Sequence, residues 1–196
     1  MVGAGYAHVW SDLRFNGAEN YELQQDSVVA SFGRRFDKRV SLRLSAGALL
    51  GGHMSGEGYD YDLAPGWLVA VSGSYQLFGD PGRVPFLVAT LTFGTSGTHT
   101  TQRGGSERTS LSTTDLRVGV MFGYTLWERV SPYAAVRGFG GPVAWHHAGL
   151  PYTGSDRHHY TLGGGVSVSL PLGLDVRVDG SALGERSVSA GLALSL

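Results

Sequence analysis

The chain has 196 residues, no cysteine and a formal net charge of −1. The lack of cysteine excludes disulfides, thiolate metal sites and cysteine nucleophiles, and the balanced charge gives no indication of a nucleic-acid surface. No apolar run approaches the roughly 18 residues of a membrane-spanning helix. No linker rich in proline or serine divides the chain, so we expect a single domain over residues 1–196.

Alternation of apolar and polar residues predicts strands along the chain. The expected strands cover residues 2–15, 26–36, 39–50, 66–78, 84–94, 111–126, 132–145, 159–170, 174–181 and 187–196. Each is close to the ~9–11 residues that cross a bilayer at a tilt. The sequence therefore predicts an all-β fold, an antiparallel up-and-down transmembrane β-barrel of ten strands, with eight as the alternative if the first strand and a neighbour are misread.

Several expected strands have one apolar face and one face of small or charged residues. The apolar faces include Val40, Leu42, Leu44, Trp67, Val69, Val71, Leu116, Val118, Val120 and Phe122. The opposite faces carry Arg43, Asp115, Arg117, Arg137, Asp175, Arg177 and Asp179. An unpaired charge facing lipid costs roughly 2–4 kcal/mol at the membrane midplane, so we expect these charges in the lumen. There Asp115 can pair with Arg117, and Asp175 and Asp179 can pair with Arg177. The charges would form either a salt-bridge network that stiffens a narrow barrel or the selectivity lining of a small pore.

The expected connections are of two kinds. Short turns alternate with longer polar stretches at roughly 16–25, 51–65, 95–110 and 146–158, and a short fifth loop covers 182–186. Short turns on one side and long loops on the other are typical of bacterial outer-membrane barrels. An even number of strands then places both termini on the short-turn side, which would be the periplasm.

Aromatic residues gather near the ends of the expected strands, as in the interfacial belts of membrane proteins. Those expected toward the short turns are Phe36, Tyr75, Phe78, Tyr124, Trp127 and Tyr133. Those expected toward the long loops are Trp10, Trp67, Trp145 and Tyr160. Ordinary cross-strand packing is the alternative explanation.

The last ten residues alternate strictly and end on an apolar residue. Ser189, Gly191, Leu192, Leu194 and Leu196 resemble the C-terminal assembly signal of bacterial outer-membrane β-barrel proteins, with Leu196 in place of the usual aromatic residue. The resemblance implies a Gram-negative outer membrane, contact with its lipid and lipopolysaccharide, and handling by the barrel-assembly machinery. We expect this strand to close the barrel on the first strand, so that no edge remains exposed. No cofactor is expected.

The expected function is that of a small structural or binding scaffold, or of a narrow pore, whose loops present residues to an external partner that the sequence does not identify. The loops also suggest an alternative. Asp60-Tyr61-Asp62 and Asp156-Arg157-His158 resemble the omptins, which are outer-membrane proteases. By that resemblance His158 would be the general base, Asp156 would orient it, and Asp60 and Asp62 would form the opposing pair.

Two other interpretations of the loops remain open. The aspartates can be ordinary solvated charges of a polar loop. A divalent metal could instead use His146, His147, His158 and His159, because imidazole is a common zinc ligand. Adjacent residues of a strand point to opposite faces, so at most one histidine of each pair would join such a site. We therefore expect no metal site, and an enzymatic activity is the less favoured hypothesis.

Overall fold

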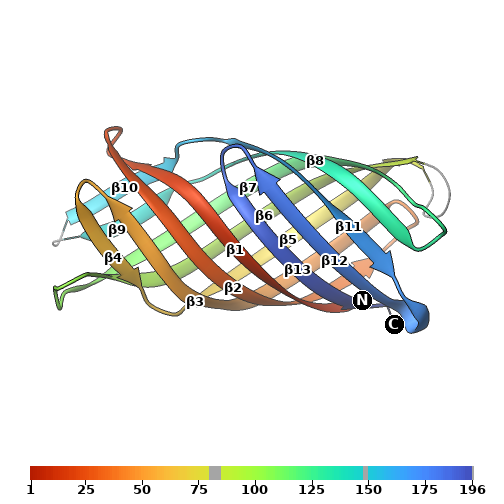
Figure 1. Cartoon of the computed structure of the whole chain (residues 1–196), viewed down its shortest axis with the longest axis horizontal. Coiled ribbons are helices and arrows are strands. Elements are labelled where there is room, and N and C mark those ends of the chain that lie inside the picture. The colour runs from red at the N-terminus through yellow and green to blue at the C-terminus, as the bar shows by residue number, and fades with distance from the viewer. Residues whose placement is uncertain (80–84, 148–149, 196) are drawn as a thin grey trace.

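The computed structural model describes residues 1–79, 85–147 and 150–195 of the chain. Within these residues one antiparallel sheet of thirteen strands closes into a ring (Figure 1). The strands are β1 (Val2–Phe15), β2 (Glu19–Arg35), β3 (Val40–Gly56), β4 (Tyr59–Leu63), β5 (Gly66–Phe78), β6 (Pro85–Gln102), β7 (Arg108–Tyr124), β8 (Val130–Gly140), β9 (Val143–His147), β10 (Leu150–Asp156), β11 (Tyr160–Ser169), β12 (Leu174–Ala182) and β13 (Arg186–Leu194). The predicted all-β antiparallel barrel is confirmed. A short 3-10 turn, η1 (Pro171–Gly173), precedes β12.

None of the described residues belongs to a helix with the length and apolar character of a membrane span.

The terminal strand closes the barrel as predicted. β13 pairs with β1 from Val2 opposite Leu194 to Trp10 opposite Arg186. Leu192 and Leu194 point outward, whereas Ser189 and Gly191 line the interior. The last residue of the proposed assembly signal, Leu196, lies outside the described residues.

The two ends of the barrel are built from different circuits of strands. We call the end that holds both chain termini the termini end, and the opposite end the far end (Figure 1). At the far end the circuit runs β1, β2, β3, β4, β6, β7, β9 and β10, and β10 pairs with β1. At the termini end β5 replaces β4, β8 replaces β9, and β11, β12 and β13 complete the circuit back to β1. Because barrel diameter grows with strand number, the lumen narrows toward the far end.

The narrowing occurs where the β12–β13 hairpin stops. On the far-end side of Trp10, β1 no longer pairs with β13 and pairs instead with β10, with Leu13 opposite Asp156. The hairpin turn between Ala182 and Arg186 therefore lies part-way along the barrel wall, on the termini-end side of the place where β10 ends.

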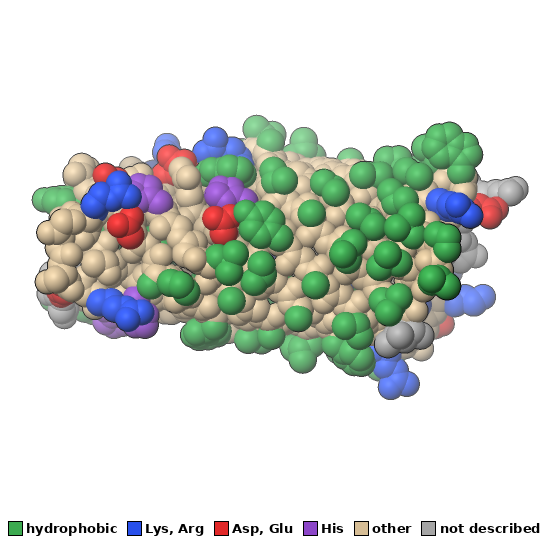
Figure 2. All heavy atoms as spheres, turned by 60° about the horizontal axis from the view of Figure 1, so that its bottom comes forward, with side chains coloured by type: hydrophobic (Ala, Val, Ile, Leu, Met, Phe, Trp, Pro, Cys, Tyr) green, Lys and Arg blue, Asp and Glu red, His purple; other side chains and the backbone are tan. Residues whose placement is uncertain are grey.

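An apolar belt surrounds the half of the barrel nearest the termini. The outward faces predicted for the third, fourth and sixth expected strands are confirmed, because Leu44, Val71 and Val118 are all exposed. Figure 2 shows hydrophobic side chains gathered over this part of the wall and charged side chains concentrated toward both ends. Such a belt matches the lipid-facing band of transmembrane barrels.

The four long loops of the prediction are wrong in large part. Residues 19–25, 51–56, 95–102 and 150–156 are strand, so the barrel wall continues well beyond the apolar belt. Two of the turns that end this wall are tight, and in them Gly17 and Gly58 adopt positive φ angles of 75° and 81°. The physical reason is that the alternation inverts. In the extension the polar residues face outward to water and the apolar residues face inward.

The structure also corrects the predicted aromatic belt at two positions. Trp145 is only 1% exposed and lies inside the far end. Tyr133 is 8% exposed and faces the lumen. By contrast, Trp67 and Tyr160 are exposed, as are Phe36 and Trp127 near the short turns.

Candidate functional site

The interior of the far end is filled by a hydrophobic core, which we call the plug. Its buried members are Leu13, Phe15, Tyr21, Leu23, Met54, Tyr61, Leu63, Leu111, Val143 and Trp145. The Trp145 ring lies 5.4 Å from the rings of Phe15 and Tyr21 and 5.0 Å from that of Tyr61, measured between centroids. Its indole N–H donates a hydrogen bond of 2.9 Å to the Thr100 hydroxyl. Side chains can fill the interior of a narrow barrel in this way.

Two phenols of the plug have raised pKa values. Burial raises the pKa of the Tyr21 phenol to about 12 and also raises the pKa of Tyr61. Neighbouring phenols and carboxylates add to both shifts, because they disfavour the phenolate. Apolar and aromatic side chains therefore occupy the interior of the barrel at the far end.

A charged layer crosses part of the lumen beneath the plug. Arg117 of β7 donates two hydrogen bonds, of 2.6 and 2.7 Å, to the carboxylate of Glu185. It also donates to Asp115, two residues before it on the same strand, and its guanidinium lies 5.2 Å from the Phe139 ring centroid. The predicted pairing of Asp115 with Arg117 is present, but Glu185 was not predicted. Glu185 lies in a hairpin turn, where an acidic residue ordinarily indicates solvent exposure, so the sequence contains no signal for its burial.

A small cavity separates this layer from the plug. It has a volume of about 260 Å³, and Asp156, Arg117 and Glu185 contribute to its wall. The Ser11 hydroxyl donates a hydrogen bond of 2.6 Å to Asp156. Burial raises the pKa of Asp156, and the Ser11 hydrogen bond opposes this effect.

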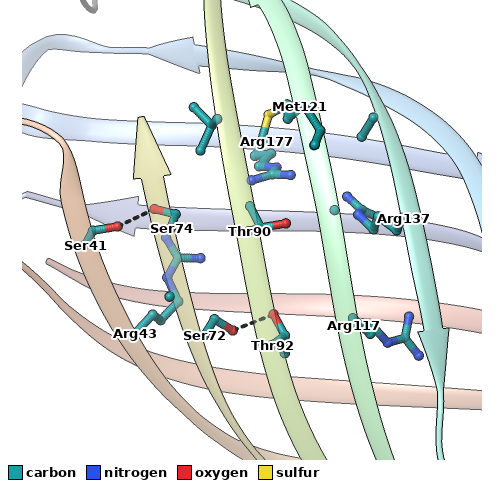
Figure 3. Close-up of a pocket in the computed structure, with 15 residues that line it drawn as sticks. Ser41, Arg43, Ser72, Ser74, Thr90, Thr92, Arg117, Met121, Arg137 and Arg177 are labelled. Carbon is teal, nitrogen blue, oxygen red and sulfur yellow. Dashed lines mark hydrogen bonds between the residues drawn. The ribbon is translucent and has the colours of Figure 1, made fainter. Parts of the chain in front are cut away.

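A second cavity lies on the other side of Arg117 and is rich in arginine. It has a volume of about 320 Å³ and is lined by the guanidinium groups of Arg43, Arg117, Arg137 and Arg177 and by serine and threonine hydroxyls (Figure 3). We call it the arginine cavity. Arg43, Arg137 and Arg177 also line a larger space of about 620 Å³ that reaches Arg35 and Ser169 near the termini end. The arginine cavity thus continues into a vestibule toward the termini.

The remaining predicted lumen charges lie in this vestibule. Arg177 donates hydrogen bonds of 2.8 Å to both oxygens of Asp179 and of 2.8 Å to the Tyr133 hydroxyl. Asp175 accepts a hydrogen bond of 2.6 Å from Ser169, although a pairing with Arg177 was also expected. Tyr133 was not predicted here, because its position near a strand end favoured a membrane-interface role.

The structure does not bring the four predicted protease residues together. Asp60 and Asp62 lie on the outer wall, with side chains 50% and 58% exposed, whereas Asp156 faces the interior. His53 lies between the two outer aspartates, at 3.4 Å from Asp60 and 3.8 Å from Asp62. A hydrogen bond from Arg103 lowers the pKa of Asp62. The barrel wall therefore separates Asp60 and Asp62, on its outer face, from Asp156, on its inner face.

The other half of the predicted protease site is also dispersed. His158 follows the end of β10, and its ring centroid lies 6.5 Å from that of Tyr160. Within the described part of the chain no hydrogen bond or ion pair joins His158 to Asp156. Among those same residues, no group of three or more histidine and acidic side chains is arranged to hold a metal ion.

Comparisons with known proteins support the fold. No family model matches the sequence, and no curated protein is similar to it. Solved structures do match. The translocator domain of the autotransporter NalP from Neisseria meningitidis is 12% identical, with a TM-score of 0.55 over 100% of this chain and 88% of that one. The chain has the fold of the bacterial outer-membrane β-barrels.

Two further barrels show similar agreement. The outer-membrane protease OmpT from Escherichia coli is 9% identical, with a TM-score of 0.57 over 97% of this chain and 93% of that one. The transport unit of the autotransporter AIDA-I from Escherichia coli is 11% identical, with a TM-score of 0.54 over 100% of this chain and 90% of that one. The likeness concerns the barrel fold. The matched structures include a translocator domain, a transport unit and a protease, so the likeness does not favour one activity.

Proposed function

We propose that the chain is an outer-membrane β-barrel of a Gram-negative bacterium, with ten passes through the membrane and a narrower, eight-stranded extension outside it. β4 and β5 share the neighbours β3 and β6, and β8 and β9 share the neighbour β7. β10 and β11 likewise follow one another along one pass. Joining these three pairs reduces thirteen strands to ten passes. The lipid-facing belt near the termini end supports a periplasmic position for both termini.

We propose further that the barrel is a closed scaffold. The observation that supports this proposal is the plug, because apolar side chains occupy the interior of the far end. The Arg117–Glu185 layer below it adds a second obstruction. The barrel therefore serves as an anchor that holds its rigid, water-facing extension above the membrane.

The outer wall of the extension would meet external partners. Its charged side chains include Asp60, Asp62 and Arg103, which form an exposed group around His53. The apolar belt would contact membrane lipid, and lipopolysaccharide would lie next to the edge of the belt that faces the far end. The β13 strand would be the element that the barrel-assembly machinery engages during biogenesis.

Planar-bilayer recordings test the closed scaffold. The purified, refolded protein should insert without producing conductance steps at either polarity, whereas a general porin in the same bilayer should conduct. Reproducible steps that scale with the amount of inserted protein would contradict the proposal and would favour the narrow pore.

The orientation has its own test, because the chain has no native cysteine. Ser106 lies in an exposed turn at the far end, and Lys38 lies in an exposed turn at the termini end, so each can be replaced by cysteine. A membrane-impermeant maleimide applied to intact cells should label Ser106→Cys and spare Lys38→Cys. The reverse pattern would show that the barrel has the opposite orientation.

A further inference from the structure

We propose that the arginine cavity is a binding site for a small oxyanion, a phosphate or carboxylate group of a solute, that enters from the termini end. The inference goes beyond the scaffold role, because it assigns a ligand to the lumen itself. In the proposed orientation the ligand would come from the periplasm.

Two of the four arginines form no ion pair with any acidic side chain among the described residues. Within the described residues, Arg43 makes no ion pair, and its guanidinium is 4.0 Å from the Met1 sulfur. Arg137 also forms no ion pair with a described side chain, yet it lines both the arginine cavity and the vestibule. A guanidinium stays protonated even when it is partly desolvated. An incoming anion would therefore find two uncompensated positive groups.

The other two arginines are fixed in place by their own partners. Glu185 and Asp115 hold Arg117, and Asp179 and Tyr133 hold Arg177. These contacts orient both guanidinium groups at the edge of the cavity. The site would thus be formed before the ligand arrives, which reduces the entropy cost of binding.

Hydroxyl groups complete the lining. Ser41 and Ser74 are hydrogen-bonded at 2.6 Å, and Thr92 donates to Ser72 at 3.0 Å (Figure 3). These groups can donate to an oxyanion once they rotate away from one another. The surface is therefore suited to a ligand with several acceptor oxygens.

A glycine makes room for one of the unpaired arginines. A Cβ atom at Gly119 would lie 2.8 Å from Arg137 Cγ and 3.1 Å from Thr90 Oγ1. Glycine at this position allows the Arg137 side chain to lie against the wall beside the cavity.

The volume and chemistry limit the class of ligand. At about 320 Å³ the arginine cavity lies at the lower end of the size range of small-molecule sites. Arginine binds phosphate and carboxylate groups through two parallel hydrogen bonds, and Arg43 and Arg137 are the guanidinium groups that have donors to offer. The expected ligand is a compact solute with one or two such groups, and a polymer would not fit.

Isothermal titration calorimetry of the protein in nanodiscs tests the site. Inorganic pyrophosphate and citrate are the probes, and sucrose is the neutral comparison. We expect saturable binding of at least one anion, weakened by added salt, and no binding of sucrose. Arg137→Gln and Arg43→Gln should each weaken binding tenfold or more. Arg108→Gln, at an exposed position in the extension, should leave it unchanged.

The outcomes separate cleanly. Binding of pyrophosphate alone or of citrate alone would support the site and identify its preferred group. Absence of binding by both anions, or binding that neither lumen variant weakens, would overturn the inference. Heat-modifiable migration on gels checks that each variant is folded. Conductance in planar bilayers would contradict the closed scaffold without affecting this result, so the two proposals can fail separately.

Discussion

Arg117 and Glu185 join two distant parts of the barrel wall through paired hydrogen bonds of 2.6 and 2.7 Å. Arg117 belongs to β7, and Glu185 belongs to the turn that ends the β12–β13 hairpin. This turn marks the level at which β10 replaces β13 beside β1. The ion pair therefore fixes the free end of the hairpin at the point where the barrel narrows.

Glu185→Gln should destabilise the barrel by about 3 kcal/mol, because it leaves the Arg117 charge with one fewer anionic partner in a confined space. Glu107→Gln changes the same residue type at an exposed turn and should alter the unfolding free energy by no more than about 0.5 kcal/mol. Urea unfolding in lipid vesicles, followed by tryptophan fluorescence, measures both. Equal stabilities for the two variants would show that the ion pair does not hold the hairpin.

Trp145→Ala should cost about 3–5 kcal/mol, the range for removing a large aromatic side chain from a packed core. The same substitution at Trp67, which is exposed on the lipid-facing wall, should cost less, because it leaves no cavity inside the protein. The same unfolding assay compares them. A larger loss at Trp67 than at Trp145 would contradict the plug.

Asp156→Asn should stabilise the protein at neutral pH. Burial raises the pKa of this carboxyl group in the folded barrel, so the folded state binds a proton more tightly than the unfolded state does. The stability linked to Asp156 is therefore present at acid pH and is lost as the pH rises through the folded pKa. Asparagine remains neutral and can still accept the Ser11 hydrogen bond.

The measurement is the unfolding midpoint of the native and variant proteins across acid and neutral pH. Asp37→Asn, at an exposed position in a turn at the termini end, is the matched control and should change the unfolding midpoint far less at every pH. If Asp156→Asn lowered stability at neutral pH, the carboxylate would be a favourable partner of Arg117, and the assignment of its burial would be wrong.

The sequence predicted the membrane-facing half of the barrel well. Leu44 and Val118 alternate with Arg43 and Arg117, and the cost of charge in lipid determines which face points outward. The same argument gave the correct closing strand, because the pattern around Leu192 is uninterrupted. These predictions succeed because one physical constraint acts on every second residue.

The far end could not be predicted by that argument. In β1, Tyr6 faces outward within the belt, whereas Leu13 faces inward above it, so the apolar face changes sides within one strand. An alternation with a period of two is the same in lipid-facing and water-facing walls. The alternation therefore does not show at which residue of a strand the bilayer ends. Glu185 was missed for a related reason, since its burial depends on the distant residue Arg117.

The most direct test of the closed lumen is one-sided labelling of Ser74→Cys, a position that lines the arginine cavity. The variant is reconstituted in vesicles whose protein orientation is established with Ser106→Cys and Lys38→Cys, and a small charged thiol reagent is added to one side. The closed scaffold predicts rapid labelling from the termini end and protection from the far end. Equal labelling rates from both sides would show a continuous path through the barrel and would contradict the account.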